Sequence, residues 1–129
     1  MTPSRPKILI VDDEAPFAEW LSEEVRERFP DCEVAVAHDG YSAGEAIGLS
    51  RPEAVILDLR MPGIDGFEVC RRIKSNPLLK NISVIALTGD ASPDARARIM
   101  GLGAEACLSK PPDLAGLFAE LAKVFGGSG

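Results

Sequence analysis

The sequence predicts an α/β fold in which five parallel strands alternate with five helices. Five short apolar segments recur along the chain, and stretches with the apolar spacing of helices lie between them. The segments are continuous rather than alternating apolar runs, as is typical of strands that are covered on both faces of a parallel sheet. In chain order, the predicted strands are Ile8–Val11, Val34–Ala37, Val55–Leu57, Val84–Leu87 and Ala106–Leu108.

Apolar spacing predicts the first and last helices. Phe17, Leu21 and Val25 lie four residues apart, so they fall on one side of a helix. Pro16 stands where the first turn of that helix tolerates a proline. The last helix is predicted from a stripe with spacing i, i+3, i+4 and i+7, formed by Leu114, Leu117, Phe118, Leu121, Val124 and Phe125.

Capping residues predict where three of the helices begin. Ser42 followed by Glu45 predicts a capping box at the start of the second helix. Ser92 before Pro93 predicts an N-cap followed by a proline at the first helical position. Asp113 is a candidate cap for the last helix. Each of these signals follows a predicted strand, which supports the alternation of strands and helices.

This alternation restricts the topology. Parallel strands need right-handed crossovers, which place helices on both faces of the sheet. A doubly wound sheet results, and the flavodoxin-like strand order 2-1-3-4-5 is its common five-stranded form. We expect one domain over residues 7–125, with an N-terminal tail over residues 1–6 and a flexible tail over residues 126–129.

Composition narrows the classes of partner and compartment. The chain has 129 residues and a formal net charge of −6, which disfavours a nucleic-acid-binding surface. No apolar stretch approaches the length of a membrane span, and the N-terminal sequence MTPSRPK lacks the apolar core of a signal peptide. We therefore expect a cytoplasmic protein that contacts neither nucleic acid nor membrane.

The cysteine and histidine content disfavours several kinds of catalytic site. No two of the three cysteines, Cys32, Cys70 and Cys107, have the spacing C-x-x-C, so reduced thiols are expected. His38 is the only histidine. A multi-histidine metal site is therefore excluded, and little material is left for a Cys/His or Ser/His catalytic set.

Polar residues follow four of the predicted strands. Asp12 and Asp13 follow the first strand, Asp58 the third, Thr88 the fourth and Lys110 the fifth. Ligands of open parallel sheets bind beyond the carboxyl ends of the strands, at the point where the strand order reverses. In the order 2-1-3-4-5 this point lies between strands one and three. We therefore expect the three aspartates to meet there, with Thr88 and Lys110 approaching from the other side.

The chemistry of this set favours magnesium-dependent phosphoryl transfer. Three carboxylates in one crevice repel one another, which raises a pKa unless a positive charge compensates. Oxygen ligands with room for water and phosphate favour Mg²⁺. A carboxylate, Mg²⁺ and a lysine suit phosphoryl transfer, and a carboxylate can itself be the nucleophile that becomes an aspartyl phosphate. The Thr88 hydroxyl is a candidate hydrogen-bond donor to a phosphoryl oxygen.

Four motifs of the chain resemble the receiver domain of two-component response regulators, the group that includes the bacterial chemotaxis receiver. The resemblance covers residues 7–125, and its motifs are ILIVDDE (8–14), VILDLRMPGIDG (55–66), ALTGD (86–90) and GAEACLSKP (103–111). Each motif alone is a weak signal. All four together, in this order and at this spacing, are a strong one.

The resemblance implies a phosphorylation site and a metal site at the same place. Asp58 would be the phosphoacceptor and would also face the metal. Asp13 would bind Mg²⁺ directly, and Asp12 would assist, often through water. The backbone carbonyl of Arg60 would be a further metal ligand.

The resemblance also implies roles for the residues on the other side and for partner proteins. Lys110 would pair with one phosphoryl oxygen, and the Lys110–Pro111 peptide bond would be cis. Thr88 would bond another phosphoryl oxygen and move towards the site on phosphorylation. The donor would be a phosphohistidine on a sensor histidine kinase or a histidine phosphotransfer protein. Phosphorylation would switch interactions with a downstream protein or output domain.

The chain departs from the family pattern at the output switch. Many receivers carry Tyr or Phe three residues before the lysine, and this ring swings inward when the threonine moves. Here the position is Cys107, which we expect to be a small hydrophobe in the fifth strand. A receiver that binds partners without phosphorylation is therefore the alternative function.

Two charged residues flank the predicted site. Arg60 stands two residues after Asp58, and Asp90 stands two residues after Thr88, positions that tune acyl-phosphate hydrolysis in the family. Arg60 either stretches over the phosphoryl group or is a solvated surface arginine, and the sequence leaves both open. Phosphatases of the haloacid-dehalogenase type need a second acid where Arg60 stands. We therefore do not expect an enzyme that acts on other molecules. We expect a domain that catalyses only its own phosphorylation and dephosphorylation.

Overall fold

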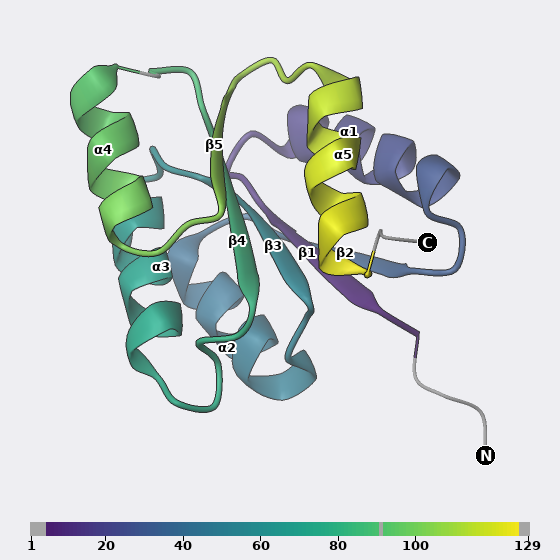
Figure 1. Ribbon diagram of the computed structural model, residues 1–129, viewed down its shortest axis with the longest axis horizontal. Coiled ribbons are helices and arrows are strands. Elements are labelled where there is room, and N and C mark those ends of the chain that lie inside the picture. The colour runs from purple at the N-terminus through teal and green to yellow at the C-terminus, as the bar shows by residue number, and fades with distance from the viewer. Residues whose placement is uncertain (1–4, 91, 127–129) are drawn as a thin grey trace.

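The computed structural model of the chain contains one sheet of five parallel strands, and it describes residues 5–90 and 92–126. Residues 1–4 and 127–129 of the two predicted tails lie outside the described residues. The strands are β1 (Lys7–Val11), β2 (Glu33–Ala37), β3 (Ala54–Asp58), β4 (Ser83–Thr88) and β5 (Ala106–Ser109). Their order is β2-β1-β3-β4-β5, so the flavodoxin-like prediction is confirmed (Figure 1).

Five helices connect and cover these strands. They are α1 (Ala15–Arg28), α2 (Gly40–Ser50), α3 (Gly66–Ser75), α4 (Pro93–Gly101) and α5 (Leu114–Val124). Helices α1 and α5 cover one face of the sheet, and α2, α3 and α4 cover the other (Figure 1). Within the described residues, no helix combines the length and the apolarity that crossing a bilayer requires.

Alternate residues of the central strands point into two separate cores. In β1, Ile8 and Ile10 belong to the core under α1 and α5, whereas Leu9 and Val11 belong to the core under α2, α3 and α4. Burial on both faces explains the continuous apolar runs of the central strands. Burial on both faces was also expected for β2, and this prediction is wrong. Only Ala37 of β2 is fully buried, because β2 is an edge strand.

The helix starts follow the predicted caps in part. Ser92 caps α4, and its hydroxyl accepts the backbone N–H three residues further on. The predicted capping box of Ser42 and Glu45 is wrong, because α2 begins earlier and Asp39 is its N-cap. The Asp39 carboxylate accepts the Ser42 N–H at 2.7 Å, which places Ser42 inside the helix. Asp113 holds the N-cap position of α5, but its side chain makes no capping hydrogen bond.

Candidate functional site

Asp58 is the last residue of β3 and lies at the carboxyl edge of the sheet. It is paired with Leu87 of β4 and is only 5% exposed. The Arg60 backbone N–H donates to its Oδ1 at 3.2 Å. A Cβ at Gly66 would lie 2.3 Å from the Asp58 carbonyl oxygen. Glycine at that position therefore lets α3 begin directly against the end of β3.

Asp12 and Asp13 follow β1 and bring two further carboxylates to Asp58. Oxygen atoms of the three side chains lie within 4.8 Å of one another. Asp12 is buried and Asp13 is exposed, and Oδ1 of Asp12 accepts the backbone N–H of Glu14 at 2.8 Å. The three carboxylates could hold a hard divalent cation, because they offer only oxygen ligands and one of them opens to solvent.

The crowded acids change the titration of Asp58. The pKa of Asp58 is raised from 3.8 to about 6, mainly by burial and to a smaller extent by the charges of Asp12 and Asp13. The hydrogen bond from the Arg60 N–H and the positive charge of Lys110 act in the opposite direction. A cation beside the three acids would favour the ionised carboxylate.

Lys110 follows β5 and supplies the positive charge that the acids face. Its Nζ donates to Asp12 Oδ2 at 2.8 Å and to Glu14 Oε1 at 2.6 Å, and it lies 3.9 Å from Asp58 Oδ2. The ammonium also lies over the Phe17 ring, 4.5 Å from its centroid. Burial disfavours the charged form of Lys110, but the hydrogen bonds to the two acids outweigh it and raise its pKa. The peptide bond that follows Lys110 is cis, the isomer that the resemblance implies.

Thr88 is the last residue of β4 and is fully buried. Its hydroxyl accepts the Asp90 backbone N–H at 3.0 Å and lies 3.3 Å from the Asp90 carbonyl oxygen, to which it donates. The hydroxyl is therefore engaged with the backbone of the loop between β4 and α4. To donate to a new partner, the hydroxyl must give up its bond to the Asp90 carbonyl.

An ion pair borders the site. The Arg60 guanidinium pairs with the Asp90 carboxylate, and the two side chains are 70% and 44% exposed. The pair connects the loop after β3 to the loop after β4. Both residues of the pair line a hollow of about 410 Å³, together with Glu14, Asp58, Gly89 and Lys110.

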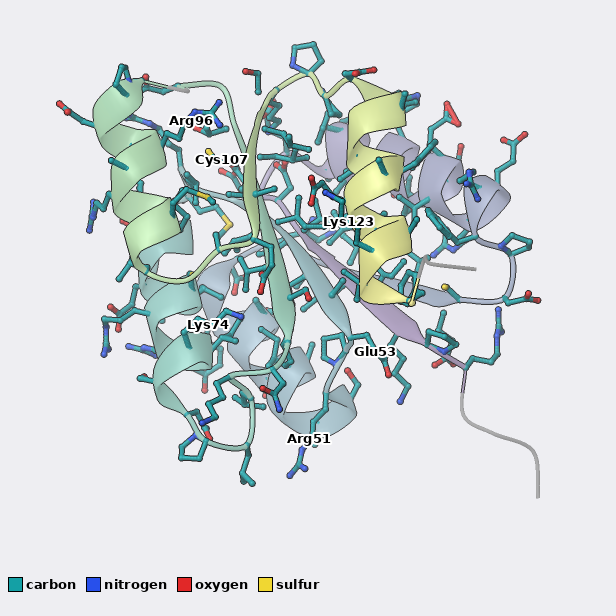
Figure 2. All side chains as sticks on the ribbon, viewed as in Figure 1. Arg51, Glu53, Lys74, Arg96, Cys107 and Lys123 are labelled. Carbon is teal, nitrogen blue, oxygen red and sulfur yellow. The ribbon has the colours of Figure 1, made fainter. Side chains whose placement is uncertain are left out.

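Cys107 lies on β5 and faces away from solvent. It is 3% exposed and packs in the core under α2, α3 and α4, and burial raises the pKa of its thiol. Its backbone carbonyl accepts a hydrogen bond from Nη1 of Arg96 at 2.6 Å, so α4 is linked to β5 at this point (Figure 2). All three cysteines of the chain are free and buried. Cys107 therefore packs as the small hydrophobe that the sequence predicts.

The structure places Asp12, Asp13, Asp58, Arg60, Thr88, Asp90 and Lys110 at one edge of the sheet, whereas Cys107 lies inside the core. It also adds two residues to the site. The sequence patterns do not assign Glu14 or Phe17 to the site. Both belong to the start of α1, and their contacts with Lys110 join positions almost a hundred residues apart in the chain. The sequence offered one signal for Glu14: it is an acid directly after the aspartate pair, at the place where a helix begins.

Comparisons with known proteins agree with this geometry. The family described as the response regulator receiver domain matches residues 8–122. The response regulator MprA of Mycobacterium ulcerans is 36% identical over 115 residues, which is 89% of this chain and 48% of that protein. The chain thus spans about half the length of the curated relatives that it matches.

Solved structures show the same fold at similar identity. The signal receiver domain of a DNA-binding response regulator from Colwellia psychrerythraea is 38% identical, with a TM-score of 0.90 over 94% of this chain and 98% of that one. The receiver domain of a signal transduction histidine kinase from Syntrophus aciditrophicus is 31% identical, with a TM-score of 0.84 over 95% of this chain and 91% of that one. On sequence and structure alike, the chain belongs to the response regulator receiver domain family.

Proposed function

We propose that residues 7–125 form a receiver that accepts a phosphoryl group on Asp58 in a Mg²⁺-dependent reaction. One observation carries the proposal. Oxygen atoms of Asp12, Asp13 and Asp58 lie within 4.8 Å of one another, and the Lys110 ammonium lies 3.9 Å from Asp58. Acids that can bind a cation, a buried nucleophile and a fixed positive charge are the parts that phosphoryl transfer needs.

The acids fit Mg²⁺ in particular. Their donors are all oxygen, and three side chains do not complete an octahedron, so places are left for water and a phosphoryl oxygen. Asp12, Asp13, Asp58 and the backbone carbonyl of Arg60 would hold the ion. When bound, Mg²⁺ supplies positive charge beside the transferred phosphoryl oxygens.

In the proposed reaction, an ionised oxygen of Asp58 attacks the phosphorus of a phosphohistidine. The new O–P bond forms while the P–N bond breaks, and the imidazole nitrogen leaves with the electron pair of that bond. Lys110 pairs with one phosphoryl oxygen, and the Thr88 hydroxyl leaves the Asp90 backbone to donate to another. Attack of water on the phosphorus later releases inorganic phosphate and restores Asp58. The chain thus catalyses only its own phosphorylation and dephosphorylation.

The proposed partners follow from the same chemistry. The donor is a sensor histidine kinase or a histidine phosphotransfer protein, because both present a phosphohistidine. Phosphate adds a charge of about −1.5 to −2 to a surface that already carries acids, and this biases the nearby loops between two arrangements. A downstream protein or output domain would read that change, as the names of the related response regulators suggest.

The intact mass of the chain after incubation with Mg²⁺ and a small acyl phosphate tests the proposal. We expect one added phosphoryl group in the wild type and none in Asp58→Asn or in samples with a chelator. A sample that gains no phosphoryl group, either from the acyl phosphate or from phosphohistidine proteins, would contradict the proposal. Circular dichroism must first show that each sample is folded.

Cys107 favours a second candidate function. A buried thiol in place of the usual aromatic ring cannot swing when Thr88 moves. The alternative is a receiver that binds its partner whether or not Asp58 is phosphorylated. Equal partner affinity for the wild type and for Asp58→Asn, measured after phosphorylation of the wild type, would favour this alternative.

A further inference from the structure

Two acids lie closer to the ammonium of Lys110 than does Asp58, the proposed phosphoacceptor. Its Nζ lies 2.6 Å from Glu14 Oε1 and 2.8 Å from Asp12 Oδ2, but 3.9 Å from Asp58 Oδ2. The Phe17 ring covers another side of the ammonium, at 4.5 Å. Because an ammonium has three N–H donors, two of them are already committed to acids other than Asp58.

The surroundings of Glu14 allow its carboxylate both to pair with Lys110 and to leave it. Its backbone is fixed, since its N–H donates to Asp12 Oδ1 at 2.8 Å. Its side chain lines the hollow above Asp58 but is 65% exposed, whereas that of Lys110 is 12% exposed. A carboxylate this exposed regains water when it leaves the lysine, so the contact is a weak one. The side chain makes no capping hydrogen bond to α1, although Glu14 holds the N-cap position.

We propose that Glu14 is a positioning residue that competes with the phosphoryl group for Lys110. The inference rests on the proposed function. In the unphosphorylated chain, Glu14 and Asp12 hold the ammonium at the side of the site. A phosphoryl oxygen on Asp58 would be a third anion for an ammonium that these two acids already hold, so it competes with them for the position of the ammonium. Glu14 yields first, because Asp12 is almost completely buried and Glu14 is not. The strength of the Glu14 contact therefore sets part of the affinity of the site for a phosphoryl group.

The variant Glu14→Gln tests this competition, because it keeps the size of the side chain and removes its charge. The probe is beryllofluoride, which binds to carboxylates as a phosphoryl analogue, and ¹⁹F NMR measures its dissociation constant. Mg²⁺ is held at saturation, as determined by a separate titration of each variant. We expect the dissociation constant to fall about two- to fivefold in Glu14→Gln, the range that corresponds to an exposed ion pair.

Two comparisons separate competition from other effects. Glu120→Gln removes the same charge from a pair with the exposed Lys123 on α5, away from the site, and it should leave the affinity unchanged. In a Lys110→Ala background, Glu14→Gln should no longer tighten binding, because the group for which Glu14 competes is gone. Tightening that persists in this background would mean that Glu14 simply repels the anion, and it would overturn the inference.

The remaining outcomes are also decisive. Equal affinities of the wild type and Glu14→Gln overturn the inference and leave the proposed function intact if the wild type binds the probe and is phosphorylated. A wild type that neither binds the probe nor accepts a phosphoryl group overturns both.

Discussion

Replacing Asp58 by asparagine should stabilise the fold at neutral pH. The carboxylate of Asp58 is 5% exposed, and burial raises its pKa from 3.8 to about 6. Ionising it in the folded state therefore costs more than ionising it in the unfolded chain. A difference of roughly two pKa units at about 1.4 kcal/mol per unit gives about 3 kcal/mol. Asparagine removes this cost and keeps an oxygen for the Arg60 N–H.

The sign of the pH dependence follows from linkage. Between the unfolded pKa near 3.8 and the folded pKa of about 6, the folded chain binds more protons at Asp58 than the unfolded chain does. The stability of the wild type therefore falls as pH rises through this window. The advantage of Asp58→Asn is nearly complete at about pH 7, about half as large at pH 5, and small below about pH 4.

Urea denaturation without divalent cations, at several pH values between 4.5 and 8, measures this difference. Asp31→Asn is a matched control, because Asp31 is an exposed acid in the loop after α1, and its replacement should change the free energy of unfolding little. A wild type that is as stable as Asp58→Asn at pH 7.5 would refute the reasoning. So would an advantage of the variant that does not decline with acid.

Three further predictions concern single side chains. Arg60→Ala should shorten the lifetime of the aspartyl phosphate by about two- to fivefold, because Arg60 and its ion-pair partner Asp90 line the same hollow as Asp58; an unchanged lifetime in a phosphate-release assay would identify Arg60 as a solvated surface residue. Glu105→Ala should lower the free energy of unfolding by about 1–2 kcal/mol in urea, because Glu105 Oε2 accepts the Val84 backbone N–H at 2.6 Å at the start of β4, and a loss below about 0.5 kcal/mol would count against this role. A moderate dose of oxidant should leave phosphorylation unchanged, because burial raises the pKa of the Cys107 thiol and keeps it protonated; a large effect that Cys107→Ala abolishes would contradict this.

The fold was predictable because each central strand is apolar on both sides and four of the five strands are followed by a helix signal. Local signals failed where two good caps compete. Asp39 and Ser42 are both strong N-cap residues, and nothing in the local sequence decides that α2 begins at the earlier one. The exposure of β2 could not be predicted from the sequence for another reason. Edge position is a property of the whole sheet, so the apolar run that precedes His38 looks the same as that of a central strand.

The candidate site was predictable to the level of which residues meet, since strand order alone brings Asp12, Asp58 and Lys110 to one edge. The hydrogen-bond partners of each group within the site were not predictable. The lysine donates to Glu14 at 2.6 Å but lies 3.9 Å from Asp58, and the Thr88 hydroxyl bonds the backbone of its own loop. Such choices depend on rotamers and on distances of about an ångström, which residue type and spacing do not determine.

The position of the phosphoryl group is the most direct test of the account. Borohydride reduces an aspartyl phosphate to homoserine, so peptide mass mapping after phosphorylation and reduction identifies the acceptor. We expect homoserine at residue 58 only, and only when Mg²⁺ was present during phosphorylation. Homoserine at residue 12 or 13, or phosphoryl groups that resist reduction because they are on other residue types, would contradict it.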